Sequence, residues 1–144
     1  MVIAPVVPIV YDAWQGRVDL DVSDRSKRGW YFLWALMCYA TAYAAYYVGE
    51  CHVMAVLSAA YFTVTLGVML ATLRYKVSVH AAGAAGPSTA LVYMYGWTAA
   101  PVVLVWGAIV WSRVKLRQHT ARQGMVGLFL GAAITALTYL WLFQ

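Results

Sequence analysis

Apolar residues along this chain form long runs, and short polar connectors separate one run from the next. A helix needs roughly 20 consecutive apolar residues to cross a bilayer. Three of the runs have about this length and two are shorter, so the pattern predicts an all-α, polytopic transmembrane bundle of about five spanning helices. The predicted helices cover residues 30–49, 53–73, 81–95, 101–111 and 123–143.

The chain before the first long run divides into two parts. Residues 1–10 are apolar but contain Pro5 and Pro8, and they are too few to span a bilayer. We expect them to form an interfacial segment or the remnant of a longer helix. Residues 11–29 are strongly charged and are interrupted by Gly16, which predicts a surface loop.

Composition supports a membrane protein with a single domain over residues 1–144. Hydrophobic residues make up 64% of the chain and charged residues 10%, whereas soluble domains are about half apolar and about a quarter charged. We therefore expect an integral, multi-pass protein of the cell membrane. The net charge of +5 would suggest nucleic acid in a soluble protein, but these charges lie at the ends of apolar runs. That placement favours membrane lipids with anionic or phosphorylated headgroups as partners, and no nucleic acid.

Counting the crossings predicts that three polar connectors meet on one side of the membrane. If the segment ending at Arg28 lies on one side, two crossings return the chain to that side before His80. Two more crossings return it again before His119. The polar residues gathered on this side include Arg28, Lys76, Ser78, His80, Ser112, Arg113 and His119.

The positive-inside rule alone would explain the sign of these charges. It does not explain why two histidines share the side, each following a basic residue and a serine. Gly127 and Gly131 are spaced so that two helix backbones can approach closely in lipid. This spacing is common in membrane bundles, and here it is also suited to holding the connectors of His80 and His119 together.

The connector after residue 111 reads Ser112-Arg113, five residues, then His119. This pattern resembles the third signature of the type 2 phosphatidic acid phosphatase family, Ser-Arg-x5-His-x3-Asp, with Gln123 at the position of the aspartate. The middle connector is similar to the second signature, Pro-Ser-Gly-His, of which Ser78 and His80 are kept. The first signature, Lys-x6-Arg-Pro, is matched only by Arg28.

Departures from the first signature change which residues would bind phosphate. Gly29 replaces the proline and Asp21 replaces the lysine, so Lys76 is the candidate for the missing ammonium group. The resemblance covers most of the chain, from Asp24 to Gly131, and the signatures come in the family's order. The family usually has six helices, and this chain would lack most of the first.

The resemblance implies a phosphatase that uses a phosphohistidine intermediate and needs neither a metal nor another cofactor. His119 would attack phosphorus, and His80 would protonate the leaving alkoxide and later activate water. The phosphate would be held by Arg28, Lys76 and Arg113, with hydrogen bonds from Ser78 and Ser112. The implied substrate is a lipid phosphate or an isoprenyl diphosphate.

Gln123 would take the place of the carboxylate that orients the nucleophilic histidine. A glutamine carbonyl can accept a hydrogen bond from His119 and fix its tautomer, but it brings no negative charge. We therefore expect a slower enzyme rather than an inactive one.

Two other functions are compatible with the same sequence. The protein could be a scaffold that binds anionic lipids without catalysis, which the altered first signature and Gln123 favour. It could also be a phosphotransferase that passes the phosphoryl group from His119 to an alcohol. The side of the membrane that carries the site, and whether the chain forms a homo-oligomer, are left open by the sequence.

Overall fold

The computed structural model describes residues 3–19, 22 and 24–143, and these residues are helical without any strand. The predicted all-α class is therefore confirmed. The helices are α1 (Ile3–Trp14), α2 (Arg25–Val48), α3 (His52–Arg74), α4 (Val79–Tyr95), the 3-10 helix η1 (Gly96–Val103), α5 (Leu104–Lys115) and α6 (Ala121–Leu142).

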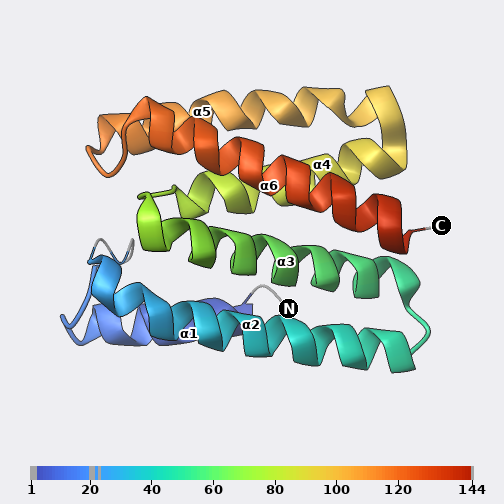
Figure 1. Cartoon of the computed structure of the whole chain (residues 1–144), viewed down its shortest axis with the longest axis horizontal. Helices are drawn as coiled ribbons and strands as arrows, with labels where there is room; N and C mark the ends of the chain where they lie inside the picture. The colour runs from blue at the N-terminus through green and yellow to red at the C-terminus, as the bar shows by residue number, and fades with distance from the viewer. Residues whose placement is uncertain (1–2, 20–21, 23, 144) are drawn as a thin grey trace.

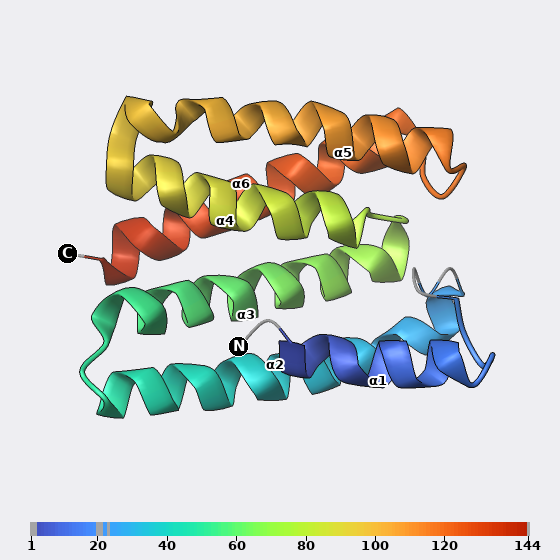
Figure 2. The ribbon, with the colours of Figure 1, turned by 180° about the vertical axis from the view of Figure 1, so that it is seen from behind.

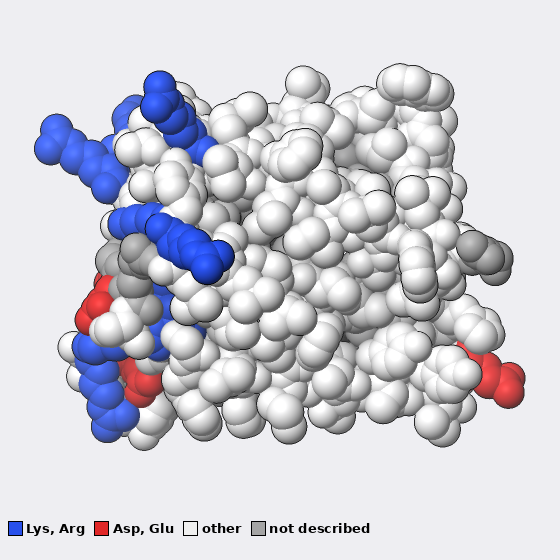
Figure 3. All heavy atoms as spheres, viewed as in Figure 1, with Lys and Arg blue, Asp and Glu red and all other residues white. Residues whose placement is uncertain are grey.

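From α2 to α6 the helices run side by side in alternating directions, as the two opposite views show (Figures 1 and 2). The α1–α2, α3–α4 and α5–α6 connections therefore lie at one end of the bundle. The α2–α3 turn, η1 and the end of α6 lie at the other. Lys and Arg side chains gather at the first end (Figure 3), which we call the cationic end. The three connectors that were predicted to share one side of the membrane thus share one end of the bundle (Figures 1 and 3).

Three helices of the described chain are long and apolar enough to cross a membrane, namely His52–Arg74, Val79–Lys115 and Ala121–Leu142. The second comprises α4, η1 and α5, and it folds back on itself at η1 (Figure 1). α2 has 24 residues but is rich in tyrosine and tryptophan, which favour the membrane interface over its apolar interior. Three helices thus have the length and the apolar composition that a membrane span needs. The number of about five crossings stays a prediction.

The N-terminal part of the chain differs from the prediction in its boundaries. Residues 11–14 belong to α1, and α2 begins at Arg25 rather than at Trp30. α2 begins early because Asp24 caps it, accepting a hydrogen bond of 3.0 Å from the Ser26 backbone N–H. The predicted loop over residues 11–29 is therefore shorter.

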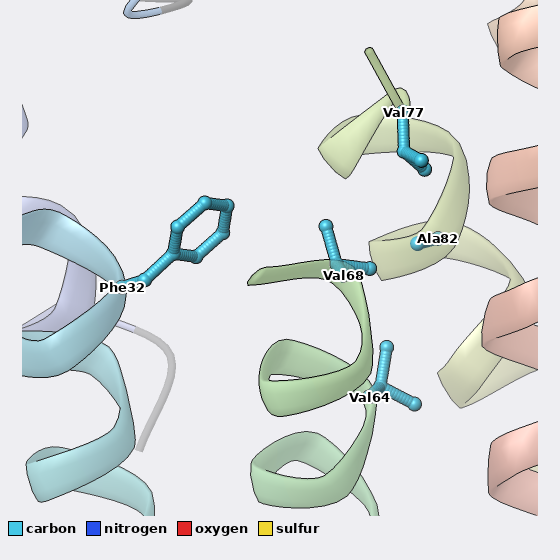
Figure 4. Close-up of a cluster of buried hydrophobic side chains, with 5 residues drawn as sticks. All are labelled: Phe32, Val64, Val68, Val77 and Ala82. Atoms are coloured by element: carbon cyan, nitrogen blue, oxygen red, sulfur yellow. The ribbon is translucent and has the colours of Figure 1, made fainter. Parts of the chain in front are cut away.

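A buried apolar cluster lies close to the cationic end and joins α2, α3 and the start of α4. Phe32 points from α2 toward Val68 of α3, and Val77 and Ala82 lie on the far side of Val68 (Figure 4). Val77 is completely buried, so the short α3–α4 connector is fixed by its own apolar side chain. This holds the polar residues on either side of Val77 in place.

α4 and α6 come into backbone contact at two glycines. A Cβ at Gly127 would lie 2.6 Å from the carbonyl oxygen of Ser78, and one at Gly131 would overlap the carbonyl of Ala82. Only glycine permits such an approach, because it has no Cβ. The Gly127-x3-Gly131 spacing is therefore a helix contact, and it joins the two helices that follow the histidine connectors.

Candidate active site at the cationic end

His119 is held by the first turn of α6. Its Nδ1 lies 3.2 Å from Oε1 of Gln123, and the Thr120 backbone N–H donates to the same oxygen at 3.1 Å. The Thr120 hydroxyl in turn accepts from the Gln123 backbone N–H at 3.3 Å, which completes a capping box. Because Oε1 only accepts, Nδ1 carries the hydrogen and the lone pair of His119 is on Nε2.

A backbone turn at the end of α5 leads to His119. The carbonyl oxygen of Arg113 accepts from the backbone N–H groups of Gln118, at 3.1 Å, and His119, at 3.3 Å. Arg117, directly before Gln118, has a φ of 54°, in the left-handed region that favours glycine. Ser112 and Arg113 are thus connected to His119 by a tight backbone turn that closes α5.

The middle connector reaches α6 through its backbone. The Ser78 N–H donates to the Gln123 carbonyl oxygen at 3.4 Å, so the residue that holds His119 also contacts the start of α4. The Ser78 hydroxyl is completely buried and caps α4 by accepting from the Ala81 N–H at 3.3 Å. Ser78 was predicted to donate a hydrogen bond to phosphate; in the structure its hydroxyl oxygen accepts the capping hydrogen bond, and the role toward phosphate stays a prediction.

Arg28 and His80 come together from α2 and α4. Both line one cavity, and Arg28 is only 5% exposed. The Nε–H of Arg28 donates to the carbonyl oxygen of Val22 at 2.7 Å, which fixes the base of the guanidinium. Asp21, at the lysine position of the first signature, lies outside the described residues.

Charge on the neighbouring connectors acts on His119. Partial burial is the main cause that lowers the pKa of His119 below 6.5, and the hydrogen bond that His119 donates to Gln123 opposes it. The positive charges of Lys76 and Arg28, together with His80, lower this pKa further. His119 is therefore a neutral base near pH 7, and groups from the other two connectors lie within electrostatic reach of it.

The structure thus brings together His119, Gln123, Lys76, Arg28 and His80 at the cationic end. It links Ser112 and Arg113 to them through the backbone turn. Thr120 also belongs to the site and was not among the predicted residues. The signal for it was present, since Thr120-x2-Gln123 directly before an apolar run is the pattern of a capping box.

Within the described residues, no group of three or more His, Cys, Asp or Glu side chains could hold a metal ion. Comparison of the chain with protein-family models, curated proteins and solved structures found no match. Function is therefore inferred from the site itself.

Proposed function

We propose that this protein is a membrane phosphatase of the type 2 phosphatidic acid phosphatase kind, acting on a lipid phosphate or isoprenyl diphosphate. One observation carries the proposal: a neutral histidine, fixed through Nδ1 by Gln123, lies within reach of cations from two other connectors. Hydrolysis of a phosphate monoester is very slow without catalysis, so charge stabilisation and positioning must supply most of the acceleration.

In the proposed reaction, Nε2 of His119 attacks phosphorus and the bond from phosphorus to the alcohol oxygen breaks. His80 gives its proton to the departing alkoxide, leaving a phosphohistidine. His80 then takes a proton from water, whose oxygen attacks phosphorus. The phosphorus–nitrogen bond breaks, its electron pair returns to Nε2, and inorganic phosphate leaves. Lys76, Arg28 and Arg113 stabilise the charge on the phosphoryl oxygens, with Ser112 as a hydrogen-bond donor.

Phosphate release by the purified protein tests this proposal, with a short-chain phosphatidic acid and an isoprenyl diphosphate as substrates. His119→Ala is expected to abolish both phosphate release and acid-labile labelling of the protein by radioactive phosphate. Lys115→Ala is the matched control, because its ammonium lies over the Trp111 ring at 4.7 Å, and it should retain activity. Full release by the His119→Ala variant would refute the nucleophile assignment.

A second candidate is a lipid-binding protein without catalysis. It is favoured by the burial of the Ser78 hydroxyl in a helix cap and by the absence of charge on Gln123. This candidate predicts that vesicles of anionic lipid bind equally well to wild type and His119→Ala, with no phosphate released by either. A phosphotransferase would instead form a new phosphate ester when an alcohol is added.

A further inference from the structure

A cavity of about 380 Å³ extends from the candidate site along the inner side of α1. Its volume lies within the range of small-molecule pockets, roughly 300–1,000 Å³. Val6 and Ile9 of α1 line it on one side, and Phe32 and Ala35 of α2 line it on another. Most of its surface is therefore apolar.

The two ends of the cavity differ in chemistry. Arg28 and His80 line it at the cationic end, whereas Tyr39 of α2 and Thr65 of α3 line it deeper in the bundle. From Arg28 to Tyr39 the helical rise of 1.5 Å per residue gives a length of about 16 Å. One leaflet of the hydrocarbon core, half of about 30 Å, has nearly this thickness.

α1 is fastened to α2 near both of its ends, so it forms a fixed wall of the cavity. Near its end, Asp12 accepts a hydrogen bond of 2.6 Å from the Tyr31 hydroxyl. Near its start, the carbonyl oxygen of Ala4 accepts from the Trp34 indole N–H at 3.0 Å. The short apolar segment before the first long helix thus has a definite role in shaping the cavity.

We propose that this cavity binds the hydrocarbon tail of the lipid substrate, with the phosphate at Arg28 and His80. The proposal rests on the proposed function, and it adds that the tail is held inside the protein rather than in the surrounding bilayer. A ligand with one anionic end and an apolar tail fits this cavity. Its anionic end would meet Arg28 and His80, and its tail would contact the aliphatic and aromatic side chains along the rest.

Tail length is the property that tests the cavity. Each methylene group buried is worth about fourfold in affinity, so the apparent affinity for n-alkyl phosphates should rise from butyl to octyl to dodecyl phosphate. Ala35→Phe places a ring in the cavity and should weaken dodecyl phosphate at least tenfold while leaving butyl phosphate unchanged. Ala40→Phe is the matched control, because Ala40 lies on the same helix but is exposed and does not line the cavity.

Two readouts on protein in nanodiscs separate the cavity from the chemistry: native mass spectrometry of the bound alkyl phosphate, and phosphate release. The tail site is supported if Ala35→Phe lowers the affinity for dodecyl phosphate and Ala40→Phe does not, whether or not phosphate is released. If the two variants have the same chain-length dependence, the tail site is refuted, even where phosphate release shows that the protein is a hydrolase. Binding that depends on the cavity without any release would refute the hydrolase and keep the tail site.

Discussion

The backbone contact between α4 and α6 makes a sharp prediction for Gly127→Ala. The new Cβ would lie 2.6 Å from the Ser78 carbonyl oxygen, and ordinary contact begins at 3.4 Å. The two helices must therefore separate locally by about 0.8 Å to restore normal packing. This displacement acts on the contact that places the start of α4 beside the first turn of α6.

Such a separation affects both stability and the site. Overpacking of this kind costs about 1–3 kcal/mol of stability. The hydrogen bond from the Ser78 N–H to the Gln123 carbonyl is already 3.4 Å long, so it should break. A misplacement near 1 Å can lower turnover roughly 100-fold, and we expect a loss of one to two orders of magnitude in kcat.

Thermal unfolding and phosphate release, measured on the same preparations, check this prediction. Gly83→Ala is the matched control, because it lies on α4 and a Cβ there would meet nothing within 4 Å. The control should unfold no earlier than wild type and keep its turnover. The α4–α6 contact would not position the site if Gly127→Ala had the unfolding temperature and the turnover of wild type. The same would hold if both variants lost stability and turnover equally.

Three further predictions concern the turn from α5 to α6. Gln123→Glu keeps the capping box and adds a carboxylate beside Nδ1, so it should raise the pKa of His119. In wild type, kcat/KM should fall on the acid side below pH 6.5, because the pKa of His119 is lowered. In the variant this fall should occur at higher pH. If it does not move, His119 does not titrate in catalysis. Thr120→Ala removes the cap and should cost about 1 kcal/mol in unfolding free energy, whereas Thr120→Ser should cost less; equal losses would rule out the cap. Arg117→Gly should stabilise the protein by about 1 kcal/mol, because φ is 54° there, with unchanged turnover; a destabilised variant would show that the Arg117 side chain contributes more than its backbone strain costs.

The all-α class and the end of the bundle at which each connector lies followed from the sequence alone. A run of apolar residues in lipid must satisfy its backbone hydrogen bonds internally, so it becomes a helix. Once the helices alternate in direction, every second connector returns to the same end. For this reason His80 and His119 could be assigned to one end without knowledge of any contact between them.

The hydrogen bond between His119 and Gln123 could be foreseen as well, because four residues along the chain is a local separation. The link between Ser78 and Gln123 could not, since it depends on how α4 and α6 are rotated and how closely they approach. The glycine spacing permits a close approach but does not specify its partner, which proved to be the Ser78 carbonyl.

Burial and enclosure were likewise decided only by the tertiary structure. The sequence did not show that packing buries Ser78 completely and that its hydroxyl caps α4. The first ten residues were expected to form an interfacial segment or the remnant of a longer helix, and only the structure showed that side chains of α2 bind α1 and that a cavity lies beside it. Sequence determined which groups reach the cationic end, because hydrophobic length and the order of crossings are properties of the chain itself. Only the packing of helices distant in sequence decided which groups meet there, because those contacts depend on distances that no local pattern encodes.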